Sequence, residues 1–320
     1  PSDKLEQFHK DVAASIQKVT NEIMVAMANY VHKETGMNSL CLAGGVALNC
    51  VANSQILKNT PFKNIFIQPA AGDAGGALGA AYYVWHQVLG NKRNFVMEHA
   101  YWGPEFSNEE IREFLDKKGV AYKFMNYDQL LKTVADLISK QDVIGWFQGR
   151  MEWGPRALGG RSILADPRNK ENWQRVNLKV KFRESFRPFA PSAMEEYAPD
   201  FFNLSFPSPY MLFVAGVKTN DIPAVTHVDK TARLQTVSKI SSPLYYGLLE
   251  EFKKLTGCPV LINTSFNIRG EPIVCTPEDA FNTFVKTDID YLVLGNFILD
   301  KKIISPKYPF VKPEISSDAD

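Results

Sequence analysis

The sequence of 320 residues predicts an α/β protein with two domains. A short apolar strand at 39–43 runs through Gly44 and Gly45 into a helical stretch, and a second strand at 64–68 runs through a glycine-rich turn into another helix. A fresh start follows at Ser107, after a segment without periodicity. Strand, glycine turn and helix in this repeated order are typical of a parallel or mixed sheet that is covered by helices.

The first predicted domain spans residues 1–92 and opens with an amphipathic helix. A lone helix cannot bury an apolar stripe, so the partner of this helix either lies downstream or is missing. The other predicted elements are a strand at 39–43, a helix at 46–59, a strand at 64–68, and a turn and helix at 69–87. The stripe consists of Leu5, Phe8, Val12, Ile16, Val19, Ile23, Met27 and Tyr30.

Residues 93–106 are predicted as a linker, and the second domain is predicted over 107–320. It begins with a capping box, in which Ser107 is the N-cap and Glu110 lies three residues on. Strands and helices then alternate in a less regular order, which predicts a mixed sheet. The predicted elements are strands at 120–125, 142–147, 210–217, 231–238, 258–263 and 290–295, and helices at 126–140, 243–257 and 277–287.

The composition excludes several classes of protein. A hydrophobic fraction of 45% and a charged fraction of 22% are typical of a globular chain, neither disordered nor fibrous. With 36 Lys+Arg and 35 Asp+Glu the formal charge is +1, so no global field favours nucleic acid or a membrane. No apolar run approaches the ~20 residues of a membrane span, no signal peptide opens the chain, and the four cysteines form no CxxC pair. We therefore expect a cytoplasmic protein with reduced thiols, no membrane association and no stable nucleic-acid partner.

One stretch concentrates positive charge. Between residues 145 and 190, ten basic residues stand against four acidic ones. Within it, EWGPRALGGRS sets Arg156 and Arg161 among glycines and prolines, which let backbone N–H groups approach an anion and hold the loop fixed. Charge-assisted bonds from arginine to phosphate contribute about 1.5–3 kcal/mol each. The loop predicts a site for a small polyanion; the alternative, a solvated basic face, is less favoured because such faces use helices and lysine.

A second polar stretch, INTSFNIRGEPIV, follows the strand predicted at 258–263. In α/β sheets, ligands are commonly bound just beyond the carboxyl ends of strands. Short amide and hydroxyl side chains there can bond phosphate, a planar amide or ribose, although the same residues also suit a turn. The residues in question are Asn263, Thr264, Ser265, Asn267 and Arg269.

The first domain offers weaker signals. Gly44 and Gly45 between a strand and a helix can hold a nucleotide phosphate at the helix N-terminus, but the absence of GxGxxG disfavours a dinucleotide site. Asp73, at the start of a glycine-rich helix, could bind Mg²⁺ or another metal, or cap the helix, and the physics alone favours capping. The sequence shows no metal-binding histidine pair, GxSxG, Walker A or Cys/His nucleophile pattern.

Long motifs resemble a known family. GWFQGRMEWGPRALGGRSILADPR, KFRESFRPFAPS and VLINTSFNIRGEPIV resemble the C-terminal domain of the NodU/CmcH/TobZ-like O-carbamoyltransferases. CLAGGVALNCVANSQI and QPAAGDAGGALGAA resemble the end of the N-terminal domain of those enzymes. The resemblance implies a partial actin/Hsp70/sugar-kinase-like lobe followed by a YrdC-like mixed-sheet domain.

The same resemblance implies carbamoyl transfer in two steps. The C-terminal domain would join carbamoyl phosphate and ATP, with Mg²⁺, into carbamoyl adenylate, and the N-terminal domain would pass the carbamoyl group to a hydroxyl of a sugar or natural product. The residues implied as catalytic are Arg156, Lys181 and Arg187. Those implied to contact substrate or ATP are Arg150, Arg161, Arg183, Asn263, Thr264, Ser265, Asn267, Arg269, Gly44, Gly45 and Asn49.

The implied metal site is where the sequence departs from the family. The resemblance makes Asp73 one ligand of a divalent metal, with iron among the candidates, and so reverses the preference for capping. The family's site is expected to need a histidine pair, and no HxxxH occurs here. We therefore expect a fragment with an intact adenylating domain and an incomplete transferase site. The stripe from Leu5 to Tyr30 agrees with a missing packing partner or with a homodimer formed through that surface.

Three alternatives stay open. A YrdC-like module that binds RNA or modifies tRNA would predict a basic domain with interleaved aromatics, which the near-neutral charge disfavours. A catalytically inactive scaffold is compatible with a fragment. A HypF-like adenylate-forming protein would carry zinc-finger CxxC pairs, which the sequence lacks.

Overall fold

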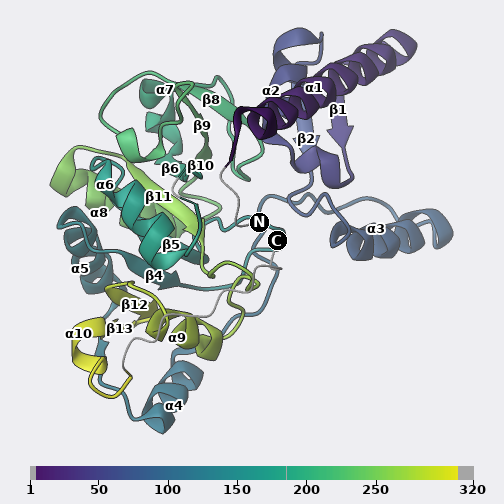
Figure 1. Cartoon of the computed structure of the whole chain (residues 1–320). Coiled ribbons are helices and arrows are strands. Elements are labelled where there is room, and N and C mark those ends of the chain that lie inside the picture. The colour runs from purple at the N-terminus through teal and green to yellow at the C-terminus, as the bar shows by residue number, and fades with distance from the viewer. Residues whose placement is uncertain (1–4, 185, 309–320) are drawn as a thin grey trace. The chain divides into compact units, whose positions relative to one another are not determined.

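The computed structural model describes residues 5–184 and 186–308, which divide into two compact units. The first unit extends to Met97 and includes Leu212–Val214, and the second comprises Glu98–Met211 and the chain from Ala215 onward. Figure 1 traces the elements of both along the chain. The boundary after Met97 falls within the segment 93–106.

The first unit has the predicted order of strand, glycine turn and helix, twice over. Its two strands pair in parallel, with Leu40 opposite Ile65, and its first helix packs against its second. A small core joins Ala28, Leu40, Ile56 and Phe62. The elements are α1 (Gln7–Thr35), β1 (Ser39–Leu42), the 3₁₀ turn η1 (Gly45–Leu48), α2 (Cys50–Asn59), β2 (Asn64–Ile67), α3 (Gly75–Tyr83) and the π-helical η2 (Val84–Val88).

Two details of this unit bear on the predictions. The amphipathic helix is confirmed, and its stripe is exposed, with Phe8 at 69% and Ile16 at 63% of full exposure. The continuous helix predicted over 46–59 is wrong, because the chain breaks at Asn49. The Asn49 backbone is extended, and its side chain accepts a hydrogen bond from the Ala52 N–H at 3.1 Å, so that a new helix starts there.

The second unit is built on a mixed sheet, as predicted. Within the described residues it has eight strands, of which β10 and β6, and β4 and β12, pair in parallel, while the other neighbours are antiparallel. In order across the sheet these are β10 (Gln235–Val237), β6 (Ala190–Met194), β11 (Val260–Ser265), β5 (Arg161–Ala165), β4 (Ile144–Phe147), β12 (Tyr291–Leu294), β13 (Phe297–Asp300) and β3 (Lys123–Phe124). A smaller sheet contains β7 (Phe202–Asn203), β8 (Val214–Val217) and β9 (Thr231–Arg233).

Helices cover this sheet. The predicted capping box is confirmed: the Ser107 hydroxyl accepts from the Glu110 N–H at 3.2 Å, and the Ser107 N–H donates to the Glu110 carboxylate at 2.7 Å. Helix α8 packs against α5, β6 and β11, and α9 packs against β4 and β12. The helices are α4 (Asn108–Lys118), α5 (Tyr127–Ser139), α6 (Glu171–Arg175), the π-helical η3 (Val176–Val180), η4 (Glu195–Tyr197), α7 (Ala198–Phe201), η5 (Pro223–Val225), α8 (Pro243–Thr256), α9 (Pro277–Val285) and α10 (Lys301–Ile304).

Strand boundaries differ most from the predictions. The run 231–238 is not one strand but two, because residues up to Arg233 belong to the small sheet whereas Gln235 pairs with Ser192 in the large one. The predicted strands 120–125 and 210–217 contract to β3 and β8. Strands β5, β6 and β13 were not predicted. Strands β5 and β6 flank β11; β5 lies within the arginine-rich stretch, and β6 begins at its last residue.

Candidate anion-binding site

Residues 148–161 form a loop around one buried carboxylate, and we call it the Glu152 loop. A single oxygen of Glu152 accepts hydrogen bonds from the backbone N–H groups of Leu158, Gly160 and Arg161, at 2.7, 2.6 and 3.2 Å. Gly160 also has no room for a side chain, because an added Cβ would lie 2.9 Å from the Arg150 carbonyl oxygen. The backbone donors expected to receive a substrate anion are therefore bound to an anion of the protein itself.

Arg161 lies inside the same loop, at 0% exposure. Its guanidinium donates to the carbonyl oxygens of Gln148, Gly149 and Gly160 at 3.0–3.1 Å and to that of Pro104 at 3.1 Å. It also lies 3.6 Å from the ring centroid of Phe147. Burial lowers the pKa of Arg161 to about 10, although the charge of Glu152 opposes the shift. The resemblance implied a substrate contact for Arg161, whereas the structure places it in the interior as a tie between backbone segments.

The other two arginines of the loop lie closer to the surface. Arg150 is exposed, forms a 3.5 Å ion pair with Glu105 and donates to the Gly103 carbonyl at 3.3 Å. Arg156 is half-buried, in the turn that follows Pro155. Of the three arginines of this loop, Arg150 and Arg156 are therefore the two that are not fully buried.

Lys181 binds the end of β11. Its ammonium donates to the carbonyl oxygen and hydroxyl of Ser265 at 2.9 and 3.1 Å, and to the carbonyl and side-chain oxygens of Asn267 at 2.8 and 2.5 Å. Burial, and secondly the charge of Arg183, lower the pKa of Lys181 well below its usual value. The structure thus brings Lys181 together with Ser265 and Asn267, which follow it by 84 and 86 residues, and all three were predicted at the site.

Three arginines lie around one carboxylate next to this lysine. The Glu184 carboxylate accepts from Arg187 at 2.8 Å through one oxygen and from Arg269 at 3.3 Å through the other. Arg183 lies near enough that burial and the charge of Arg187 lower its pKa to about 10. We call Lys181, Arg183, Glu184, Arg187 and Arg269 the Glu184 cluster. Its four cations and one anion leave a local excess of positive charge, which attracts small anions.

Asn177 holds two members of the cluster, Arg183 and Arg187, by hydrogen bonds. Its side-chain oxygen accepts from the Arg183 Nε at 2.7 Å, and its amide donates to the Arg187 carbonyl at 2.8 Å. The Trp173 Nε1 donates to the same carbonyl at 2.7 Å. Neither side chain was predicted, because their contacts depend on how the chain folds back after η3.

Asn263 is buried and ties strands together. Its amide donates to the Ala157 carbonyl, the Ser192 hydroxyl and the Gln235 side-chain oxygen at 2.9–3.1 Å. Its own side-chain oxygen is buried without a hydrogen-bond partner among the described residues. Thr264, beside it, is half-buried opposite Ile163. Ser192 and Gln235 were missed, although two buried polar residues within apolar strands were a signal for them.

The first unit holds the remaining predicted residues. The Gly44 N–H donates to the Ala71 carbonyl at 2.8 Å, and Gly44 has a φ of 98°, which explains why glycine is needed there. Gly45 begins the 3₁₀ turn, and Asn49 caps α2 and bonds Gln17 at 3.1 Å. Asp73 is exposed one residue before Ala74, the N-cap of α3, where no side-chain cap bond forms.

These residues do not make a complete metal site. Across residues 5–184 and 186–308, no group of three or more histidine, cysteine or acidic side chains could hold a metal ion. Asp73 alone supplies one ligand, so the described residues do not fit the implied metal. The expectation of Mg²⁺ or iron stays a prediction, and no chemical step is derived from it. In the described part of the chain, no helix has both the length and the apolar composition that a bilayer crossing requires.

Comparison with known proteins gives partial overlaps with solved structures. Full-length HypF in the phosphate- and nucleotide-bound form matches with a TM-score of 0.41 and 18% identity, over 54% of this chain and 22% of that one. P. abyssi Sua5 complexed with L-threonine matches with a TM-score of 0.42 and 12% identity, over 54% of this chain and 48% of that one.

Sequence relatives match over far more of the chain. An uncharacterized Synechocystis protein, sll1178, is 52% identical over 94% of this chain and 54% of its own length. Nodulation protein NolO of Bradyrhizobium diazoefficiens is 48% identical, over 92% of this chain and 55% of its own length. Nodulation protein NolNO of Sinorhizobium fredii is 44% identical, over 94% and 45%. The chain thus spans about half the length of the curated relatives it matches.

Two family models account for most of the chain. The model of the carbamoyltransferase N-terminus matches residues 2–82, and that of the carbamoyltransferase C-terminus matches residues 135–301. The second match contains both the Glu152 loop and the Glu184 cluster. The chain belongs to the carbamoyltransferase family.

Proposed function

We propose that the second unit binds ATP and carbamoyl phosphate at the Glu184 cluster and joins them into carbamoyl adenylate. In the whole protein the carbamoyl group then passes to a hydroxyl of a small acceptor, such as a sugar or a natural product. The observation that carries the proposal is the Glu184 cluster, in which Arg187 and Arg269 pair with one partly exposed carboxylate. Arg183 and Lys181 lie beside this pair of arginines. Both substrates are phosphorylated, and a transferring phosphoryl group needs positioned positive charge more than a covalent nucleophile.

The proposed reaction forms carbamoyl adenylate and releases inorganic phosphate and pyrophosphate. Water attacks the phosphorus of carbamoyl phosphate and the bond from phosphorus to the carbamoyl oxygen breaks, which gives carbamate and inorganic phosphate. A carbamate oxygen then attacks the α-phosphorus of ATP, the bond to the bridging oxygen breaks, and pyrophosphate departs. Arg187 and Arg269 would neutralise the phosphate oxygens, with Glu184 giving up its place to the substrate anion. Lys181, held against Ser265 and Asn267, would add a hydrogen-bond donor at a fixed place at the end of β11.

Pyrophosphate release tests this proposal. The protein is incubated with Mg²⁺, ATP and carbamoyl phosphate, and both released phosphates are measured. We expect release from the parent chain and a loss of at least about a hundredfold in Lys181→Ala and in Arg187→Ala, since each removes a charge from the transition state. Arg156→Ala is expected to lose release as well, as the resemblance implies.

Lys179→Ala is the matched control. Lys179 lies in the same basic stretch, and its exposed ammonium forms a 3.8 Å surface pair with Asp288. We expect this variant to release pyrophosphate at the parental rate. No release from the parent chain, or parental rates in both Lys181→Ala and Arg187→Ala, would refute the proposal.

A further inference from the structure

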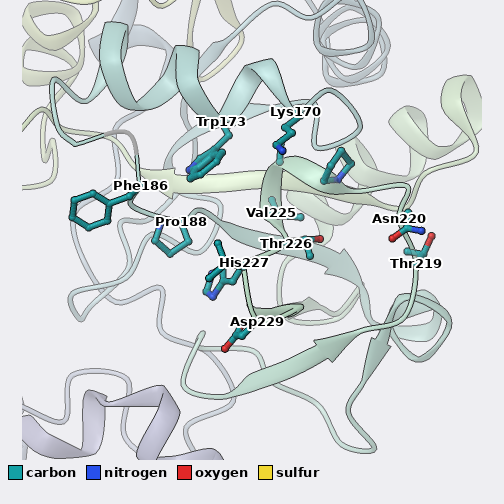
Figure 2. A pocket seen from close by; sticks show the side chains of 13 residues that line it. Lys170, Trp173, Phe186, Pro188, Thr219, Asn220, Val225, Thr226, His227 and Asp229 are labelled. Atoms are coloured by element: carbon teal, nitrogen blue, oxygen red, sulfur yellow. The ribbon is translucent and has the colours of Figure 1, made fainter. Parts of the chain in front are cut away.

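A cavity of about 520 Å³ lies in the second unit, and the function proposed above gives it no role. Three segments form its walls: the start of α6, residues 186–188, and residues 219–229 around η5. Figure 2 shows the side chains that line it, with Trp173 extending from α6. The cavity adjoins the Glu184 cluster, because Arg187 lies between two residues of its wall, Phe186 and Pro188.

The walls carry several flat rings. Trp173, Phe186 and His227 each present a flat aromatic ring, and Pro188 adds an apolar surface. Burial lowers the pKa of His227, with the charge of Asp229 opposing the shift and that of Arg233 adding to it, which favours the neutral imidazole. Flat rings around an open volume favour a planar heterocycle, which stacks on them through its faces.

Hydrogen bonds hold the Trp173 ring and the backbone that carries His227. The Trp173 Nε1 is held by the Arg187 carbonyl at 2.7 Å. His227 begins a tight turn, in which its N–H donates to the Thr231 carbonyl at 2.9 Å and its carbonyl accepts from the Lys230 N–H at 3.0 Å. A wall that is partly held in place needs less ordering when a rigid ring binds to it.

Polar groups complete the lining. The side chains of Lys170 and Asn220 border the cavity and have no hydrogen bond to any described residue. An amide such as that of Asn220 can both donate to and accept from the edge of a nitrogen heterocycle. A hydrocarbon ligand would leave these polar groups without a partner.

We propose that this cavity binds the nucleobase of the nucleotide whose phosphates the Glu184 cluster receives, an inference that rests on the proposed function. Arg187 belongs to the cluster, and its two neighbours in the chain belong to the cavity wall. One nucleotide can therefore place its phosphates on the guanidinium groups and its base between the rings. The cavity is large enough for a purine together with its ribose.

Binding of three probes by titration calorimetry tests this assignment: ATP, adenosine and inorganic tripolyphosphate. Removal of one stacking partner weakens binding of a base by about tenfold or more. We therefore expect Phe186→Ala and His227→Ala to weaken ATP and adenosine by that factor and to leave tripolyphosphate unchanged. Arg187→Ala is expected to weaken binding of tripolyphosphate and to leave binding of adenosine unchanged.

Tyr127→Ala serves as control, since Tyr127 is another exposed aromatic of the second unit, at 50% against 59% for Phe186. It is expected to bind all three probes like the parent chain. Unchanged affinity for ATP and adenosine in both Phe186→Ala and His227→Ala, or no adenosine binding by the parent, overturns the inference while leaving parental pyrophosphate release intact. Loss of pyrophosphate release in the parent, with adenosine still sensitive to Phe186→Ala, would instead refute the proposed function and keep the cavity assignment.

Discussion

The Glu152 loop and the Glu184 cluster each place one glutamate among arginines, but the first has a structural role and the second is the candidate ligand site. Glu152 is buried and accepts three backbone N–H groups, and the guanidinium of Arg161 is enclosed by carbonyl oxygens. Glu184 is partly exposed, and its carboxylate accepts hydrogen bonds from the guanidinium groups of Arg187 and Arg269. A substrate anion cannot replace a buried carboxylate that binds backbone N–H groups. It can replace a solvent-exposed carboxylate in an ion pair at a small cost in free energy. Arginine in a glycine-rich loop is therefore a scaffold in one place and a candidate ligand in the other.

The largest expected effect that would test this contrast is on folding. Arg161→Met leaves several buried carbonyl oxygens without a donor at once, so we expect the free energy of unfolding to fall by about 3–5 kcal/mol. Denaturant titration measures this. Arg150→Met, which removes an exposed arginine from the same loop, is the control and should change the value by less than about 0.5 kcal/mol. Equal stability of the two variants would remove the scaffold assignment.

Glu152→Gln is expected to have the next largest effect. The amide oxygen can still accept, but it loses the charge that strengthens three short hydrogen bonds, and a loss of about 1–3 kcal/mol follows. The change should appear in the denaturant midpoint. A variant as stable as the parent chain would show that the charge of Glu152 does not organise the loop.

Glu184→Gln is the matched change in the other region and should act on binding instead. Its ion pairs are exposed, so stability should change by less than about 1 kcal/mol. Removal of the resident negative charge should tighten binding of inorganic pyrophosphate about fivefold, the equivalent of about 1 kcal/mol of Coulomb energy at a wet site. Calorimetry at low and high salt checks this, because the gain should shrink as salt rises. Weaker binding would mean that Glu184 is needed to position the arginines.

The smallest effect concerns a second scaffold cation, Lys301, whose ammonium donates to the Phe284 carbonyl. Burial lowers the pKa of Lys301 to about 8, with Asp288 and Asp290 opposing the shift. Between pH 8 and the ordinary lysine pKa of about 10.4, the unfolded chain holds more protons than the folded one, so stability rises with pH. The difference in unfolding free energy between the parent and Lys301→Met should therefore move in favour of the parent over this range. A difference that stays constant with pH would contradict the shift.

Local signals explain which parts of the fold could be predicted. The capping box of Ser107 and Glu110 depends on residues three apart, and the stripe on α1 depends on helical spacing, so both could be read from the sequence. The split of residues 231–238 could not, because it depends on strands distant in the chain that pair with Gln235 but not with Arg233. Strands β5 and β6 were hidden for a related reason: arginine and proline at their starts look like loop residues until the neighbouring strand is known.

The site divides in the same way. Motif residues such as Lys181, Ser265 and Asn267 could be named from the sequence, and the fold brings them within hydrogen-bonding distance. The opposite roles of Glu152 and Glu184 could not be foreseen, since each depends on which donors the closed loop turns inward. Asp73 and the glycines of the first unit show the converse limit, because a motif does not by itself supply the other ligands of a metal.

The Arg187 carbonyl accepts hydrogen bonds from both Trp173 and Asn177, and Asn177 also holds the guanidinium of Arg183. The Arg187 carbonyl thus connects the aromatic lining of the cavity to the Glu184 cluster, so a displacement of one shifts the other. The consequence is cooperativity: adenosine and tripolyphosphate, given as separate molecules, should each bind more tightly when the other is present, and by the same factor in both directions.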